Sequence, residues 1–197
     1  MAARVDPFLL HAAEYEAGRA PRLLVVRPAR YLAVPGPGGA GGPEIEAAAA
    51  RLLAVARVLK AWVRRARGKD FRVPPIEVLW RGDGPRGSSE AGDVPWPWKL
   101  LLRVPAFVRP ADAARAAAEV PGDGPDPRLE DLEEGRCLQA LCAGTGARTL
   151  ALEGLRLAAV ERGLAFRGRL HEVWLSDPRR AAPERRRSLL RRPVRSR

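Results

Sequence analysis

The chain has 197 residues, 46% of them hydrophobic, and this length can bury a core as one domain or as two fused small ones. Its apolar runs are shorter than about 18 residues, so we expect no membrane span, and acidic residues interrupt the apolar N-terminal stretch, which argues against a signal peptide. We therefore expect a cytoplasmic protein. The net charge of +12 comes mostly from scattered arginines, which predicts weak, salt-sensitive attraction to nucleic acid without a motif for specific recognition.

The two cysteines and two histidines offer little for metal or thiol chemistry. Cys137 and Cys142 lie five residues apart on a predicted strand, so their side chains point to opposite faces and a disulfide between them is not expected. There is no CxxC motif, and His11 and His171 are the only histidines. We therefore expect no metal, no cofactor and no Cys–His nucleophile pair.

Hydrophobic periodicity, punctuated by glycine and proline, divides the first half of the chain into strands and helices. The expected elements are an amphipathic N-terminal arm over 1–21, one bent or two short strands over 22–34, a loop over 35–43, a helix over 45–67, strands over 75–81 and 98–104, and a short helix over 110–120. Gly68 ends the long helix, whose buried stripe comprises Ile45, Ala49, Leu52, Ala56, Leu59 and Val63.

The second half repeats this order. It comprises a strand over 132–143 with a turn at Gly135, a helix over 148–162 closed by Gly163, a strand over 171–175, a turn of helix around 183–187 and a strand over 189–194. Its third element, HEVWL, is similar to the IEVLW of the first half. The order predicts an α+β fold of tandem β-α-β-β halves, about 22–105 and 128–195, with antiparallel sheets and a central groove for small ligands.

The strand over 171–175 carries an acid and an indole on one face, because alternation places Glu172 beside Trp174. One interpretation is a half-exposed strand with a solvated acid. The other is an aromatic-walled pocket, since a second acid and further tryptophans also lie near strand ends; they are Glu77, Trp80, Trp96 and Trp98. Parity places Trp98 with Leu100 and Leu102, and it places Trp80 on the face opposite Glu77. A tryptophan in a small domain usually belongs to the core, where we place Trp62, and this alternative stays open for each of the others.

Four segments carry a resemblance to a known family; they are ARYLAVPGPG, PPIEVLW, WPWKLLLRVPAFV and HEVWLSDPRRAAPERRRSLLRRPV. They resemble the gyrase-inhibitor-like (GyrI-like) small-molecule-binding proteins, a family that includes drug-binding domains of multidrug-sensing regulators. The resemblance covers nearly everything from Pro21 to Val194. The last segment is similar to a stand-alone subgroup, the cyclopropanoid cyclopropyl hydrolases, which open the strained ring of DNA-alkylating natural products inside an aromatic cage. The family fold is a tandem β-α-β-β pair, which implies one domain over 22–197 after the arm over 1–21.

The resemblance also implies site residues. Glu172 matches the family's pocket glutamate, and Trp174 and Trp98 stand at positions that are often aromatic. Glu77 and Trp80 match a PLEGLW-like segment of the family. These residues, with Trp96, are therefore the expected walls of the pocket.

The sequence departs from the family pattern at three positions. Val78 replaces a frequent glycine, and Leu53 and Arg57 stand on the long helix where pocket-facing aromatic residues are expected. Part of the cage is therefore expected to be missing or reshaped, and this affects the substrate class more than the fold.

In the reaction that the resemblance implies, water attacks the cyclopropane carbon, the dienone becomes a phenol and charge accumulates on the carbonyl oxygen. Glu172 is the expected catalytic residue, which either orients the water or, if protonated, donates to the carbonyl. Such an activity would confer xenobiotic or antibiotic resistance. The alternative is a protein that sequesters or senses drugs without turnover. A protein partner such as gyrase is a third possibility, for which the sequence shows no contact surface.

Overall fold

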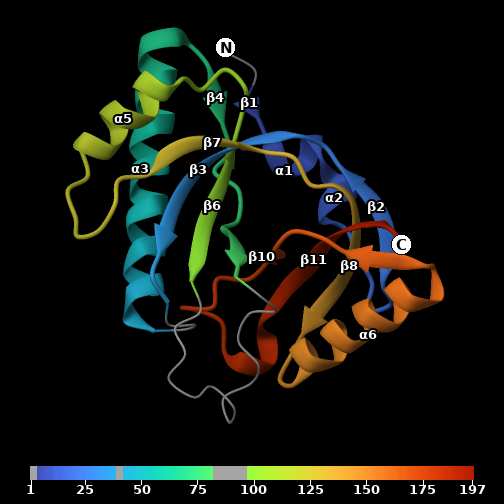
Figure 1. Ribbon diagram of the computed structural model, residues 1–197. Coiled ribbons are helices and arrows are strands. Elements are labelled where there is room, and N and C mark those ends of the chain that lie inside the picture. The colour runs from blue at the N-terminus through green and yellow to red at the C-terminus, as the bar shows by residue number, and fades with distance from the viewer. Residues whose placement is uncertain (1–3, 39–41, 82–96) are drawn as a thin grey trace.

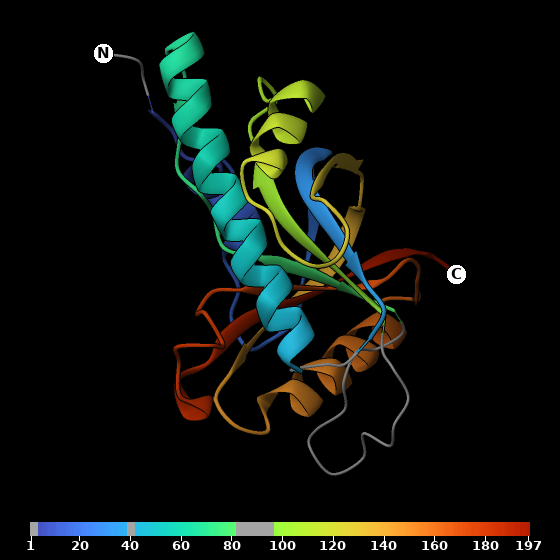
Figure 2. The same cartoon turned by 90° about the vertical axis from the view of Figure 1, so that its left-hand side faces the viewer.

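The computed structural model describes residues 4–38, 42–81 and 97–197, which form an α+β fold built on one large antiparallel sheet (Figure 1). In spatial order its strands are β2 (Arg22–Val26), β8 (Gly135–Ala143), β11 (Arg187–Ser196), β10 (Leu170–Trp174), β5 (Glu77–Trp80), β6 (Trp98–Val104), β3 (Ala29–Gly36) and β7 (Arg128–Leu132); β9 (Leu164–Phe166) also pairs with β11. The helices α3 (Pro43–Arg67) and α6 (Ala147–Glu161) pack on the same face of this sheet (Figures 1 and 2).

Shorter elements complete the described part of the chain. They are α1 (Pro7–Leu10), α2 (Ala12–Tyr15), α5 (Pro110–Ala118), the 3₁₀ turn η1 (Pro183–Arg185), and the strands β1 (Arg4–Val5) and β4 (Asp70–Phe71), which pair with each other in parallel. The expected α+β class with an antiparallel sheet is confirmed. The turn expected at Gly135 is confirmed by its φ of 68°, but it divides the expected strand over 132–143, because Leu132 belongs to a separate strand, β7, and β8 begins at Gly135. As a result β7 pairs with β3, whereas β8 pairs with β2 and β11.

Helix α3 follows its sequence signals closely. Pro43 occupies the first turn, where a missing N–H removes no hydrogen bond, and Gly68 ends the helix with φ of 62° while donating to the Arg64 carbonyl at 3.1 Å. The expected apolar stripe is fully buried, with Val55 added to it. The stripe therefore fixes which side of α3 packs against the sheet.

The centre of the sheet is the antiparallel pair of β5 and β10. Glu172 lies opposite Val78, and Val173 lies opposite Glu77. Because successive side chains on a strand point to opposite faces, Glu172 and Trp80 lie on the face that the helices cover, whereas Glu77 lies on the other. The parity predicted for Glu77 and Trp80 is confirmed.

The main hydrophobic core lies between the sheet and the two long helices. It joins the inner stripe of α3 to the inner residues of α6, and from the sheet it includes Trp80, Trp98, Leu100 and Leu102. The expected common face of Trp98 and the two leucines is thereby confirmed. Of the tryptophans on the helix-covered face, Trp80 and Trp98 are buried members of this core, and Trp174 is half-buried and packs against it.

The opposite face holds a buried ionic network that the N-terminal arm covers. Its centre is His171, whose Nε2 lies 2.8 Å from Oε2 of Glu77 and whose Nδ1 lies 2.9 Å from Oε2 of Glu134. Tyr15, from α2, donates to Oε1 of Glu77 at 2.8 Å, and Arg191 lies 3.2 Å from Glu134. The arm is therefore attached to the back of the central strands through the hydrogen bond of Tyr15 to this network.

The paired charges determine the protonation of this network. Burial by itself lowers the pKa of His171, but Glu134 and Glu77 reverse this and raise that pKa to about 9. Burial likewise opposes ionisation of Glu134, and the charge of His171 overcomes it, so the pKa of Glu134 falls to about 2. The imidazolium and both carboxylates are therefore charged at neutral pH.

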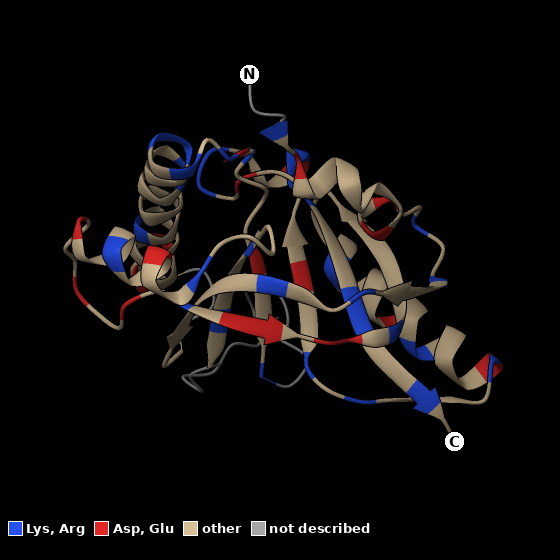
Figure 3. Ribbon diagram, turned by 90° about the horizontal axis from the view of Figure 1, so that it is seen from above, with Lys and Arg blue, Asp and Glu red and all other residues tan. Residues whose placement is uncertain are grey.

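Charged residues are also spread widely over the surface, and Figure 3 shows lysines and arginines on helices, strands and loops rather than on one element. Both cysteines are free; Cys137 is buried, and burial together with the charge of Glu172 raises the pKa of the Cys142 thiol. No helix in residues 4–38, 42–81 and 97–197 has the length and apolar character needed to cross a membrane.

The His171 network predicts a loss of stability at alkaline pH. Because the folded-state pKa of His171 exceeds its unfolded value, the stabilisation is complete below pH 6.5 and is lost as the pH rises through about 9. We expect the free energy of unfolding to fall by on the order of 3 kcal/mol across that window, measured by urea denaturation.

The control compares substitution of His171 with the same substitution of His11, which lies outside the network. His11→Gln should keep this fall in stability, whereas His171→Gln should remove it. A wild-type stability that stays constant from pH 6.5 to 9 would contradict the expected role of the network.

Candidate functional site

Glu172 lies in the middle of the sheet, on β10 and beneath the two helices. The residue is 8% exposed, and its Oε2 accepts hydrogen bonds from Nε1 of Trp80 at 2.9 Å and from Nη1 of Arg148 at 2.5 Å. A carboxylate on an apolar face needs such partners, because burial of an unpaired charge is strongly unfavourable. The interpretation of a solvated acid on a half-exposed strand is therefore wrong.

Arg148, in the first turn of α6, is a site residue that sequence reasoning missed. Its side chain is 20% exposed, and its guanidinium carbon lies 5.7 Å from the centroid of the Trp80 ring. It therefore contacts both Glu172 and Trp80, through an ion pair and a cation–π interaction. The sequence offered only an arginine at the start of an expected helix, a common and uninformative feature.

Two indoles lie on either side of Glu172 along the sheet. Trp80 is paired with Leu170, two residues before Glu172, and Trp174 follows two residues after it. Trp174 is half-buried against the core, and its backbone N–H donates to the Ile76 carbonyl at 2.9 Å. The helix-covered face thus presents a carboxylate between two aromatic side chains.

Trp98 is the cross-strand neighbour of Trp80, but its ring extends towards β3, away from β10. The ring packs over Gly36 and donates from Nε1 to the Gly38 carbonyl at 3.1 Å. It also forms a wall of a cavity of about 410 Å³ between the end of β3, the first half of α3 and residues 123–125. That cavity is not lined by Glu172, Trp80 or Trp174, so the structure separates Trp98 from the glutamate.

The other candidates lie in different surroundings. Glu77 is fully buried on the opposite face, where it contacts His171. Leu53 is half-buried and Arg57 exposed on α3, and helical spacing places both on the flank of α3 opposite the Trp98 cavity. Trp96 lies outside the described residues. The cluster that the structure assembles is therefore Glu172, Trp80, Trp174 and Arg148.

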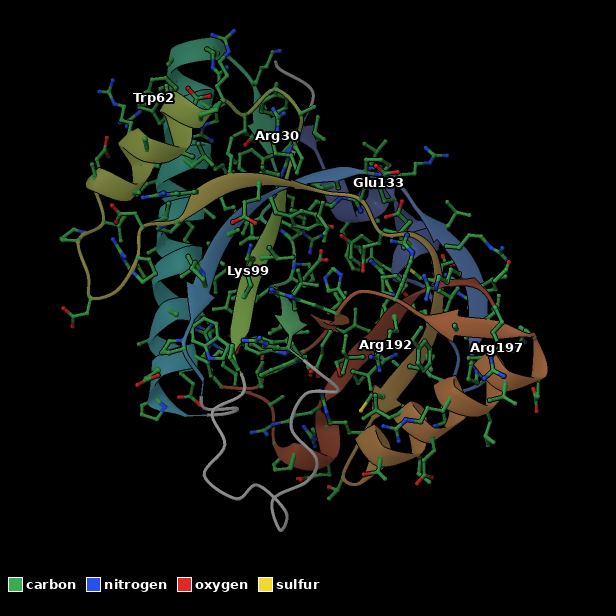
Figure 4. The ribbon with its side chains drawn as sticks, viewed as in Figure 1. Arg30, Trp62, Lys99, Glu133, Arg192 and Arg197 are labelled. Carbon is green, nitrogen blue, oxygen red and sulfur yellow. The ribbon has the colours of Figure 1, made fainter. Side chains whose placement is uncertain are left out.

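Trp62 lies away from this cluster. It stands on α3 beside α5, as Figure 4 shows, with the guanidinium carbon of Arg115 5.2 Å from its ring centroid. Its half-buried ring packs against the core, as the sequence interpretation places it. Within the described ranges, no group of three or more His, Cys, Asp or Glu side chains could hold a metal ion.

Comparison with solved structures shows proteins of the same fold. An uncharacterized conserved protein from Listeria innocua is 29% identical with a TM-score of 0.82, and a hydrolase from the same organism is 27% identical with a TM-score of 0.83. Each match covers 98% of this chain and 100% of the other. No protein-family model and no curated protein matches the sequence.

A more distant match is the C-terminal domain of EcmrR, which is 9% identical with a TM-score of 0.55 over 89% of this chain and 97% of that domain. At this identity the likeness shows the fold alone. Together these structures support the GyrI-like fold that the sequence resemblance implies.

The packing of Trp98 over Gly36 gives a testable prediction. A Cβ atom at Gly36 would overlap the Trp98 ring, so Gly36→Ala must displace the ring from the cavity wall. We expect a loss of about 1–3 kcal/mol in the free energy of unfolding, measured by urea denaturation.

The matched control is Gly18→Ala, because a Cβ at Gly18 meets no atom within 4 Å. Its stability should remain within about 0.5 kcal/mol of wild type. Equal stabilities of the two variants would show that the position of the Trp98 ring is not restricted by Gly36.

Proposed function

We propose that this chain binds planar aromatic small molecules beside Glu172, against Trp80 and Trp174, and hydrolyses the cyclopropane ring of DNA-alkylating cyclopropanoids. In the cytoplasm such an activity would protect the cell from these compounds. The observation that carries the proposal is the buried Glu172 carboxylate, held by Trp80 and Arg148 on an otherwise apolar face. The likeness to a Listeria innocua hydrolase over almost the whole chain supports it.

The strand order supports a construction from two related halves. Strands β3, β6 and β5 adjoin in one half, β8, β11 and β10 adjoin in the other, and the halves meet at the β5–β10 pair. Each half contributes one long helix to the same face. The halves also exchange edge strands, because β2 pairs with β8 and β7 pairs with β3. Glu172 lies beside the β5–β10 pair at which the two sets of three strands meet, where the tandem fold is expected to bind a ligand.

In the proposed reaction the oxygen of water attacks the cyclopropane methylene carbon. The bond between this methylene carbon and the carbon of the dienone ring breaks. Its electron pair enters the dienone, which becomes a phenolate. Glu172 accepts a proton from the attacking water and then releases it to solvent, and the phenolate takes up a proton from solvent, so the net change is addition of one water. The indoles hold the flat substrate, and its release of strain supplies much of the driving force.

The alternative function is sequestration without turnover. It is favoured by the hydrogen bonds of Trp80 and Arg148 to Oε2 of Glu172, which hold the carboxylate in place as a counter-charge. Incubation with a spirocyclopropyl dienone, followed by mass spectrometry, separates the two functions. A water adduct formed faster than in buffer indicates a hydrolase, and unchanged compound retained by the protein indicates a binder.

The role of Glu172 is tested by Glu172→Gln, which keeps the shape of the side chain and removes its ability to accept the proton. We expect ligand binding to persist and turnover to fall by about 10²–10⁴-fold, measured as the rate of water-adduct formation.

Glu161→Gln, at an exposed position near the end of α6, is the matched control and should retain wild-type turnover. Retention of turnover in Glu172→Gln would show that another group handles the proton.

A further inference from the structure

Arg148 has two nitrogens whose hydrogen-bonding capacity is unused. Nη1 binds Glu172, but Nε and Nη2 are buried and have no hydrogen-bond partner in the described part of the chain. In a planar guanidinium, the N–H bonds of Nε and Nη2 run parallel and form a two-pronged donor. This pair of donors, which we call the Arg148 fork, is directed away from the atom that holds Glu172.

An unpaired fork is a stronger signal than a single unpaired nitrogen. Arg22 and Arg67 also leave a buried nitrogen without a partner, but in each case it is Nε alone. Leaving a buried donor unsatisfied costs stability, and groups of this kind in a folded protein call for an explanation such as a bound ligand. The Arg148 fork is moreover adjacent to Trp80, whose ring lies 5.7 Å from the guanidinium carbon.

We propose that the Arg148 fork binds an acceptor oxygen of the ligand, and that this oxygen is a neutral carbonyl conjugated to a planar ring system. The inference rests on the proposed function and specifies its ligand class. A carbonyl oxygen has two lone pairs and can accept both N–H bonds of the fork. Its ring would stack on the Trp80 side of the site, and the partly exposed Arg148 side chain would shift to admit it.

The charge balance favours a neutral acceptor over a carboxylate or phosphate. Glu172 already neutralises Arg148 through the 2.5 Å ion pair, so an anionic ligand would bring an uncompensated negative charge into an apolar site. A carbonyl brings none in the bound ground state. In the proposed ring opening, negative charge appears on this oxygen as the electron pair enters the dienone, and the fork then stabilises the phenolate more than the starting ketone.

The test uses a matched pair of flat probes, 9-fluorenone and fluorene, which differ in one carbonyl group. Equilibrium dialysis gives the dissociation constant of each probe with the full chain. We expect wild type and Glu172→Gln to bind fluorenone about 10-fold more tightly than fluorene, since hydrogen bonds to a charged donor contribute differences of this size. The double variant Arg148→Met with Glu172→Gln, which differs from its control only at the guanidinium, should bind both probes equally.

The outcomes separate this inference from the function on which it rests. If wild type binds both probes equally, or if the double variant keeps the preference for fluorenone, the assignment to Arg148 is overturned, while the proposed binding of flat aromatic molecules beside Glu172 stands. If neither probe binds wild type, the proposed function is overturned as well. Should the double variant fail to fold, Arg148→Lys keeps a positive charge for Glu172 but lacks the fork, and the same loss of preference is expected.

Discussion

A charged side chain on the inside of an apolar sheet must be paired, and this requirement organises the centre of the molecule. Strand β10 carries two such side chains in succession, and alternation sends His171 to one face and Glu172 to the other. Each face therefore has its own polar partners: Glu77 and Glu134 around His171, Trp80 and Arg148 around Glu172.

The two networks have different surroundings and different consequences. On the back face, residues of the N-terminal arm pair with the network; Arg103 donates to Glu14 at 2.7 Å and Arg191 to the Glu14 backbone carbonyl at 2.7 Å. Those charges are closed off and serve stability. Both networks leave a buried polar group without a hydrogen bond among the described residues: Oε1 of Glu134 on the back face, and the Arg148 fork, beside Trp80, on the helix-covered face. An incompletely satisfied polar group beside aromatic rings is the arrangement expected of a binding site.

Local patterns were sufficient for much of the fold. The apolar stripe of α3, its end at Gly68 and the alternation in β5, β6 and β10 are local properties, and the structure retains each of them. The strand β7 was not predicted, because its RLEDL segment is polar and is stabilised by pairing with β3, about a hundred residues away in the chain. The candidate site was predictable to the same degree. The common face of Glu172 and Trp174 followed from alternation along their strand. Glu77 was grouped with them, although alternation placed it on the face opposite Trp80.

The sequence by itself determined which side chains share a face of a strand or helix, since the periods of two and 3.6 residues are set by backbone geometry. It therefore determined that Glu172 and Trp174 share one face of their strand, whereas the register of β5 against β10 placed Trp80 on that face. Only the tertiary structure decided that Arg148 of α6 reaches this surface and that the Trp98 ring turns away over Gly36. Those contacts depend on how α6 packs across the sheet and on the absence of a Cβ on the neighbouring strand, and neither is encoded in the segment that carries the glutamate.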